Sequence, residues 1–331
     1  MGLIISIAAL VAAAVFIIAF YTFSICFRTP VNHPNDPYVP LKGKQYAAVA
    51  DNIHSCISIM DKTPCRWVYV NSFDDLQLAG RYYHTADGAP LVILMHGYRS
   101  LALRDCCGGF MLCKKMGFNV LAVDQRAHGC SEGSVISFGI QERYDCQRWV
   151  DFAVAEFGPD TKIVLSGLSM GAATVLMASS LSLPENVVAI MADSPYNTAS
   201  GIIRKVCRDG NLPDGLAYPF IKLGAKVFGH FNLEETSAME SVKHAKVPIL
   251  LIHGEDDRFV PCDMSRELYE ACGDMAQLHT FPEAGHGLAY MIDPVRYEIV
   301  TVDFLWDIPE LTDHMQTNAY AQKIRQRQLD F

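Results

Sequence analysis

Short apolar runs alternate with longer amphipathic segments along most of this chain. The runs that predict buried strands are Leu91–Met95, Phe118–Val123, Ile163–Leu165, Val187–Met191, Val247–Ile252 and Gln277–Phe281. The segments that predict helices are Arg104–Met116, Gln141–Phe157, Ala172–Ser180, Asp263–Cys272 and Pro294–Trp306. This alternation predicts an α/β fold with a mostly parallel central sheet flanked by helices.

The pattern changes before, within and after this region. Ahead of the first buried run, Gln45–Met60 predicts an amphipathic helix, and Trp67–Val70 with Leu76–Tyr83 predicts an antiparallel hairpin. The alternation breaks at about 196–246, where glycines separate short apolar runs. We therefore predict one domain at 45–310 with an insertion at about 196–246.

The polar tail at 311–331 carries Lys323, Arg325 and Arg327 close together. A solvated terminal helix is the default interpretation of this tail, and contact with anionic lipid is the second.

The N-terminal segment Leu3–Phe27 contains no charged residue. It exceeds the roughly 20 apolar residues that a helix needs to cross a bilayer. A core helix of this length would carry a polar face, and a cleaved secretory signal would have a small-residue cleavage site after it. We predict a retained single-span membrane anchor at 1–28, followed by a proline-containing linker at 29–44.

Two features favour a cytoplasmic domain. Arg28, Lys42 and Lys44 follow the apolar span, and positive flanks tend to stay on the cytoplasmic side. The 11 cysteines form no short-spaced disulfide framework, as expected in a reducing compartment.

Composition excludes several kinds of partner. The net charge of -9 argues against nucleic acid or an anionic surface as the main partner. No C-x-x-C pair, no Cys/His cluster with zinc spacing and no nucleotide or flavin motif is present. We expect no metal ion and no cofactor, and the sequence does not indicate an oligomeric state.

The stretch Lys162–Ala173 predicts a strand, a G-x-S-x-G turn and a helix in succession. Gly167 and Gly171 permit a turn so tight that a side chain at either position would strike the neighbouring strand or helix. Ser169 would project clear of the sheet at a helix N-terminus, which favours developing negative charge. This context predicts a nucleophile rather than an ordinary turn.

Two polar loops at predicted strand ends, 253–261 and 282–287, supply partners for Ser169. His286, neutral near pH 7, can take the serine proton and later return it to a leaving group. Asp257 is our choice for the carboxylate that orients His286. The chain order Ser, Asp, His is the order expected of elbow-type enzymes.

Two other carboxylates compete with Asp257. Asp256 is its neighbour, and Asp193 follows the strand after the elbow. We assign Asp193 to capping a helix that starts near Ser194–Pro195.

Acyl transfer also needs donors for the oxyanion that forms in the transition state. The backbone N–H of Met170, directly after the nucleophile, is one candidate. The Tyr98 N–H, in the loop after Leu91–Met95, is the other. His96, which stands before a glycine at a strand end, is expected to brace this loop.

Taken together, these stretches resemble the α/β-hydrolase superfamily. They are H-G-Y at 96–98, D-Q-R-A-H-G-C-S at 124–131, G-L-S-M-G at 167–171, H-G-E-D-D-R-F-V-P at 253–261 and A-G-H at 284–286. The match runs from about Trp67 to Trp306. Within the superfamily, the chain is most similar to membrane-anchored, prokaryotic-type serine hydrolases related to the prolyl-oligopeptidase and esterase groups.

The resemblance implies a triad of Ser169, Asp257 and His286 with an oxyanion hole at Tyr98 and Met170. The stretch at 124–131 usually reads D-x-R-G-H-G-x-S in this group, so Ala127 replaces a glycine. This stretch is expected to brace the loops around the site without acting in catalysis.

Insertions after the strand that follows the elbow form a lid in this superfamily. We therefore expect 196–246 to be a small helical lid, with Tyr196, Tyr218, Phe220 and Phe228 as candidate walls of the substrate pocket. Aromatic side chains in such an insert also pack its own core, so both interpretations stay open. An apolar lid beside a membrane anchor suits a lipophilic acyl ester.

We expect a serine hydrolase that cleaves carboxylic esters, from small molecules to lipid-like substrates, with thioesters and amides ranked second. One alternative is a serine peptidase or amidase of prolyl-oligopeptidase-like type. The chain has no room for a large gating domain, and it shows no acidic pair for a substrate amino terminus. A non-catalytic binding protein with this fold is the other alternative, against which the complete triad argues.

Overall fold

The protein is described from a computed structural model, which describes residues 1–29, 36–39 and 43–329. Its strands are β1 Arg66–Asn71, β2 Gln77–Tyr83, β3 Leu91–Met95, β4 Asn119–Val123, β5 Ile163–Leu168, β6 Val187–Asp193, β7 Ile249–Gly254 and β8 Ala276–Phe281. Its α-helices are α1 Gly2–Phe27, α2 Lys44–Ala48, α3 Ala50–Lys62, α4 Ala102–Asp105, α5 Cys107–Lys115, α6 Glu142–Phe157, α7 Met170–Ala178, α8 Ala199–Asp209, α9 Asp214–Phe228, α10 Ala238–Val242, α11 Asp263–Cys272, α12 Ala289–Ile292, α13 Pro294–Trp306, α14 Thr312–Thr317 and α15 Ala319–Leu329. Residues 30–35 and 40–42 of the predicted linker lie outside the described residues.

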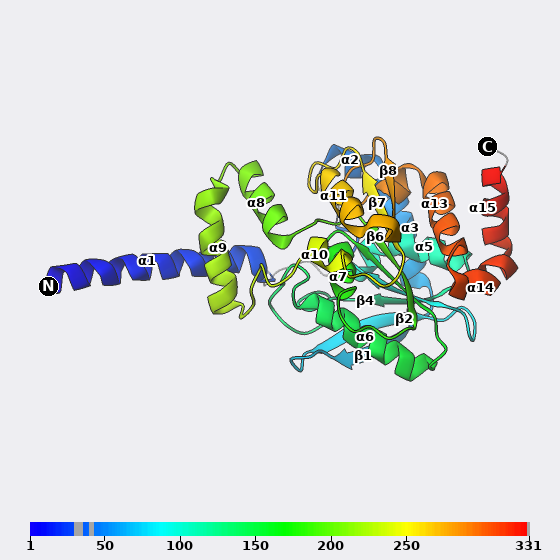
Figure 1. Cartoon of the computed structure of the whole chain (residues 1–331), viewed down its shortest axis with the longest axis horizontal. Coiled ribbons are helices and arrows are strands. Elements are labelled where there is room, and N and C mark those ends of the chain that lie inside the picture. The colour runs from blue at the N-terminus through cyan, green and yellow to red at the C-terminus, as the bar shows by residue number, and fades with distance from the viewer. Residues whose placement is uncertain (30–35, 40–42, 330–331) are drawn as a thin grey trace.

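All the described strands belong to one sheet, in the order β1-β2-β4-β3-β5-β6-β7-β8. The strands from β4 to β8 in this order pair in parallel. The β1–β2 hairpin joins their edge in antiparallel fashion through β4. Helices pack on both sides of the sheet (Figure 1). The predicted fold, a mostly parallel sheet flanked by helices, is confirmed.

The two faces of the sheet carry separate hydrophobic clusters, because successive side chains of a strand point to opposite faces. On β3, Ile93 packs into the cluster that holds Trp149 of α6, whereas Val92 packs into the one that holds Phe110 of α5. All four side chains are buried. Burying a large apolar side chain stabilises the fold by about 1.5–3 kcal/mol.

Two predicted helices are interrupted. Gln45–Met60 forms α2 and α3, which meet at Val49, and Arg104–Met116 forms α4 and α5, which meet at Cys106. The second break precedes Gly108, where a Cβ would lie 2.8 Å from the Tyr290 ring. Glycine permits this close approach within the first turn of α5.

The helix predicted near Ser194–Pro195 does not form. α8 begins later, at Ala199, and the Thr198 hydroxyl caps it by accepting from the Gly201 N–H at 2.9 Å. The assignment of Asp193 as a helix cap is therefore wrong.

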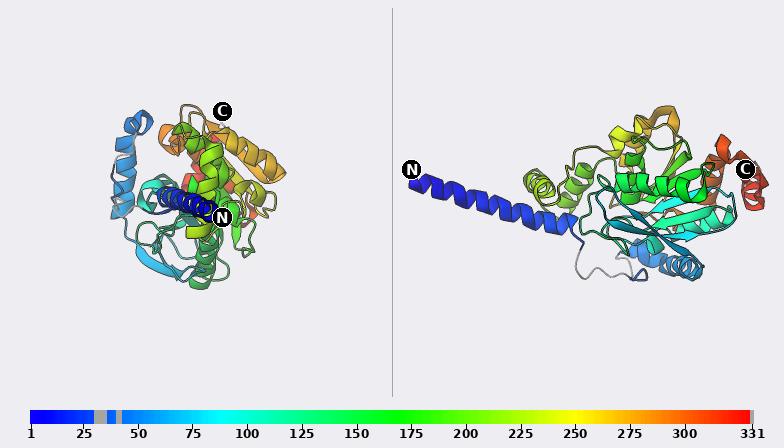
Figure 2. Two further views of the ribbon diagram at one scale, coloured as in Figure 1. Left: turned by 90° about the vertical axis from the view of Figure 1, so that its left-hand side faces the viewer. Right: turned by 90° about the horizontal axis from the view of Figure 1, so that it is seen from below.

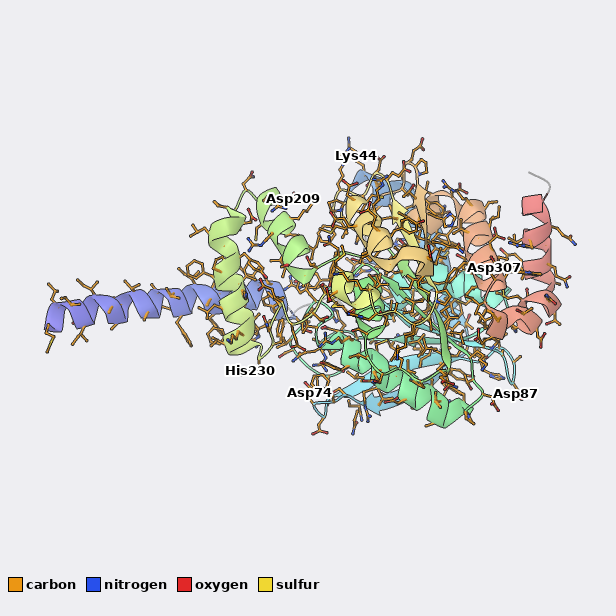
Figure 3. The ribbon with its side chains drawn as sticks, viewed as in Figure 1. Lys44, Asp74, Asp87, Asp209, His230 and Asp307 are labelled. Carbon is orange, nitrogen blue, oxygen red and sulfur yellow. The ribbon has the colours of Figure 1, made fainter. Side chains whose placement is uncertain are left out.

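Helix α1 projects away from the sheet domain (Figures 1 and 2) and is long and apolar enough to cross a membrane. Figure 3 shows the side chains of its N-terminal part pointing into open space. α9 crosses its C-terminal part, where a Cβ on Gly224 would lie only 2.4 Å from the Ala19 carbonyl oxygen. The Phe228 ring packs edge-on against Phe16 and Phe20, at centroid distances of 4.8 and 5.1 Å.

The predicted polar tail is a packed element in the described residues. Its helices α14 and α15 bury Met315, Ala321 and Ile324. Arg325 of α15 pairs with Asp303 of α13 at 2.6 Å. The tail lies at the end of the molecule opposite the free end of α1 (Figure 1).

Replacing Gly171 with alanine is expected to destabilise the fold by more than about 3 kcal/mol, because its Cβ would lie 2.1 Å from the Met95 carbonyl oxygen. Thermal unfolding in detergent measures the loss. Gly109→Ala is the matched control, since the nearest neighbour of its Cβ is 3.5 Å away on Leu94. A Gly171→Ala protein as stable as the control would contradict the prediction.

Candidate active site

Three side chains from different elements meet at the carboxyl end of the sheet. Ser169 lies between β5 and α7, Asp257 follows β7, and His286 follows β8. Ser169 Oγ lies 2.8 Å from His286 Nε2, and His286 Nδ1 lies 2.6 Å from Asp257 Oδ2. An ionised carboxylate only accepts hydrogen bonds, so Nδ1 carries the proton and Nε2 can accept from the serine hydroxyl. The residues selected from three distant segments form one hydrogen-bonded chain.

The backbone at Ser169 is strained, with φ 56° and ψ -114°. A non-glycine residue seldom adopts a positive φ, and such strain often accompanies functional sites. The flanking glycines explain how the turn is accommodated. A Cβ on Gly167 would lie 2.3 Å from the backbone of Gly171. The side chain of Ser169 is thereby held at the start of α7.

Asp257 is buried among donors. Its Oδ1 accepts the N–H groups of Phe259 and Val260, each at 2.8 Å. On its other side, the buried His253 places Nε2 at 2.9 Å from the Val260 carbonyl and 3.3 Å from Asp257 Oδ2. Burial alone would raise the pKa of Asp257, but hydrogen bonds from His253 and His286 hold it well below its usual range. The carboxylate therefore stays ionised beside His286.

The loop after β3 leaves one backbone donor available. The Gly97 N–H donates to Asp105 Oδ2 at 2.8 Å, and the Arg99 N–H donates to His128 Nε2 at 2.9 Å. Within residues 1–29, 36–39 and 43–329, the N–H of Tyr98 between them makes no hydrogen bond. It is therefore free to donate to a bound group.

The second candidate donor is the backbone N–H of Met170, the residue directly after Ser169. Met170 is the first residue of α7, so its N–H has no acceptor one turn earlier in the helix. The loop of Tyr98 approaches closely, since a Cβ on Gly97 would lie 3.3 Å from Ser169 Cβ. This arrangement is suited to holding an oxyanion between the two N–H groups.

The same loop holds the end of α1. The Tyr98 hydroxyl donates to the Cys26 carbonyl at 2.7 Å. Arg99 Nη2 donates to the carbonyls of Ile25 and Arg28, at 2.5 and 2.9 Å. Helix-end carbonyls lack partners within the helix, and these side chains satisfy them. The projecting helix is thus attached to the loop that carries the Tyr98 N–H.

The bracing role predicted for His96 and for 124–131 is consistent with the contacts. The buried His96 bonds the Gly97 carbonyl through Nδ1 at 2.8 Å and accepts the Gln125 N–H through Nε2 at 3.0 Å. Ala127 has φ 63°, the left-handed conformation that favours glycine. The alanine therefore adopts a backbone conformation that a glycine would adopt with less strain.

A cavity of about 210 Å³ lies beside Ser169. Its apolar walls include Ile53 of α3, Leu94 of β3, Cys107 of α5 and Met291 of α12. Tyr46 of α2 also lines it and donates its hydroxyl to the His286 carbonyl at 2.9 Å. The sequence predicted a helix at Gln45–Met60 but gave no sign that it covers the site.

The insertion 196–246 is helical, as predicted, since it forms α8, α9 and α10. In the described part of the chain it contributes no residue to this cavity, so the pocket-wall interpretation of its four candidate aromatic side chains is wrong and the packing interpretation holds. Tyr196 donates to the Phe138 carbonyl at 2.9 Å and Tyr218 to Glu234 at 3.0 Å. Phe228 packs on α1, and Phe220 is half-buried on the same helix, α9. The insertion packs on α1 instead, because both present apolar side chains to each other.

The two rival carboxylates do not orient His286. Asp256 is exposed. Asp193 lines the cavity, where it accepts from the hydroxyls of Ser194 at 2.8 Å and Tyr297 at 3.2 Å. Burial raises the pKa of the Asp193 carboxyl. In the part of the chain that the structure describes, no group of three or more His, Cys, Asp or Glu side chains could hold a metal ion.

The sheet order, the strained serine elbow and the Ser–His–Asp chain define an α/β hydrolase. Residues 92–298 match the alpha/beta hydrolase family, and the chain belongs to that family. Uncharacterized protein YqkD of Bacillus subtilis is 25% identical over 70% of this chain and 76% of its own length. Human protein ABHD12B is 28% identical over 56% of this chain, which spans half of that protein. A solved structure of the Pyrococcus furiosus esterase Pf2001 superposes with a TM-score of 0.61, at 24% identity, over 77% of this chain and 93% of the esterase.

Tyr98→Phe tests whether the attachment to α1 positions the loop. The variant keeps the backbone N–H but loses the hydroxyl bond to Cys26. We expect Ser169 to react with a fluorophosphonate about twofold to tenfold more slowly, since one hydrogen bond contributes about 0.5–1.5 kcal/mol. Tyr69→Phe, at an exposed position of β1, is the matched control. Equal rates in both variants would refute the positioning role.

Proposed function

We propose that this protein is a serine hydrolase that cleaves carboxylic esters. Ser169 is the nucleophile, His286 the general base and acid, and Asp257 the group that orients His286. The observation that carries the proposal is the chain from Ser169 Oγ through His286 to Asp257, with distances of 2.8 and 2.6 Å, beside the N–H groups of Tyr98 and Met170. The esterase Pf2001, which shares the fold, adds support by analogy.

The reaction follows from these positions. Ser169 Oγ attacks the ester carbonyl while His286 Nε2 takes its proton. The N–H groups of Tyr98 and Met170 donate to the oxyanion of the tetrahedral intermediate. Its carbon–oxygen bond to the alcohol then breaks, and His286 returns the proton to the leaving alkoxide. Water repeats the sequence on the acyl-enzyme and releases the acid and free Ser169.

Ser169→Ala tests this proposal directly. The detergent-solubilised parent should be labelled by a fluorophosphonate, and the variant should not. Ester turnover should fall by about 10³-fold or more, because the nucleophile and its base act as a unit. Ser182→Ala, at an exposed position, is the matched control and should keep both properties. A folded parent that takes no label would exclude the hydrolase function.

We propose a lipophilic acyl ester as the substrate. The cavity beside Ser169 has a volume of about 210 Å³. That volume and its apolar walls suit an acyl chain of medium length. The same proposal places lipid against exposed apolar side chains of α9 and the loop before it, which are Leu212, Leu216, Leu223 and Val227.

We also propose that α1 is a membrane anchor and that the domain lies on the cytoplasmic side. The length and apolar composition of α1 support the anchor. The free state of all 11 cysteines and the basic flank after α1 favour the cytoplasmic side.

The anchor is tested by charging the exposed positions Leu10 and Val11 of α1. The parent should stay in the membrane pellet after alkaline carbonate washing, whereas Leu10→Arg/Val11→Arg should be released. Each arginine at the centre of a span costs about 2.5–3.5 kcal/mol. Val295→Arg, at an exposed position of α13, should leave the parent behaviour unchanged. A parent that washes off would disprove the anchor.

A further inference from the structure

Arg104 is a largely buried cation that lines the same cavity as the proposed nucleophile. Its side chain is only 9% exposed. It lines the cavity of about 210 Å³ that contains Ser169, and it also lines a second cavity of about 180 Å³ between 36–39, α2 and α3. Tyr46 and Ile53 line both cavities as well. Arg104 therefore lies where the two cavities adjoin.

The polar contacts of Arg104 leave most of its donors unused. Nε donates to Ser100 Oγ at 3.2 Å and lies 3.9 Å from Asp105 Oδ1. Across the described residues, no other hydrogen bond or ion pair involves the side chain of Arg104. Its two terminal NH₂ groups are therefore unpaired.

The carboxylate nearest to Arg104, that of Asp105, pairs with Nε at 3.9 Å and leaves the two terminal NH₂ groups without an acceptor. The Asp105 carboxylate is already engaged, since Oδ1 accepts the Ser100 hydroxyl at 2.5 Å and Oδ2 accepts the Gly97 N–H at 2.8 Å. Asp193 is the other carboxylate among the cavity-lining residues, and Ser194 and Tyr297 donate to it.

Arg99 is the other arginine that lines the cavity of Ser169, and its side chain makes hydrogen bonds to the end of α1. Its Nη2 donates to the carbonyls of Ile25 and Arg28 at the end of α1. Among the cavity-lining residues that the structure describes, Arg104 is thus the cation with terminal donors available to a ligand.

Terminal N–H groups that line a cavity and have no protein acceptor are available to an anionic ligand, which would add to the long Nε–Asp105 pair. The planar fork of N–H groups of a guanidinium matches a carboxylate or phosphate, which it can bind through two hydrogen bonds. We propose that Arg104 binds an anionic group, a carboxylate or phosphate oxyanion, on the ester substrate. This inference rests on the proposed ester hydrolysis and narrows its substrate to esters that are apolar at one end and anionic at the other.

Two matched ester pairs test the proposal on the full-length protein in detergent. The first pair varies the acyl end and compares 4-nitrophenyl hexanoate with 4-nitrophenyl hydrogen adipate. The second varies the alcohol end and compares methyl 4-(hexanoyloxy)benzoate with 4-(hexanoyloxy)benzoate. We expect kcat/KM to favour the anionic member by about tenfold to a hundredfold in one pair, which also identifies the end that carries the charge.

Arg104→Gln should reduce this ratio to about one, and Arg104→Lys should retain part of it as a point charge. Arg148→Gln is the matched control, since it removes an equal charge from an exposed position of α6. It should leave the ratio unchanged.

Three outcomes overturn the inference. One is a parent that hydrolyses the neutral esters with no anionic preference in either pair. Another is Arg104→Gln lowering the rates of all four esters equally, which would assign Arg104 to bracing Ser100. If no ester is hydrolysed and Ser169 takes no fluorophosphonate, the proposed function fails and the anion site fails with it.

Discussion

The tight turn around Ser169 is the constraint on which the rest of the site depends. Gly171 lies so close to β3 that a single added carbon would meet the Met95 carbonyl at 2.1 Å, and Ser169 is held at φ 56°. This contact brings the end of β3, and with it the loop of Tyr98, against the start of α7. The sheet then determines where the loops after β7 and β8 deliver Asp257 and His286, because parallel strands end at the same edge.

Buried polar contacts hold the loops that the sheet does not reach. Arg126 binds Asp145 through two hydrogen bonds of 2.6 and 2.7 Å and fixes the segment 124–131 beneath the Tyr98 loop. Leaving one such partner unpaired inside the protein would cost several kcal/mol, so the network favours one loop conformation. Because Tyr98 and Arg99 also hold the last turn of α1, the projecting helix is joined to the site as well as to the domain.

Local sequence features predicted the elements well, because they depend on neighbours along the chain. Apolar runs such as Leu91–Met95 correspond to strands, and the glycines at 167 and 171 are required by contacts within one turn. The same reasoning left Phe228 undecided between a wall of the substrate pocket and packing within the insertion. Its burial depends on α1, some 200 residues earlier, and an aromatic side chain looks the same in either environment.

The sequence by itself determined the fold class, the elbow and the three residues that meet in the Ser–His–Asp chain, because motif order and strand ends specify them. Only the tertiary structure decided the walls of the cavity and the attachment of α1 to the loop of Tyr98. Tyr46 covers the site from α2, and Arg104 lies nine-tenths buried between two cavities, although no spacing in the chain relates either residue to Ser169. The physical reason is that packing between distant segments decides burial and pairing, whereas sequence patterns report only on near neighbours.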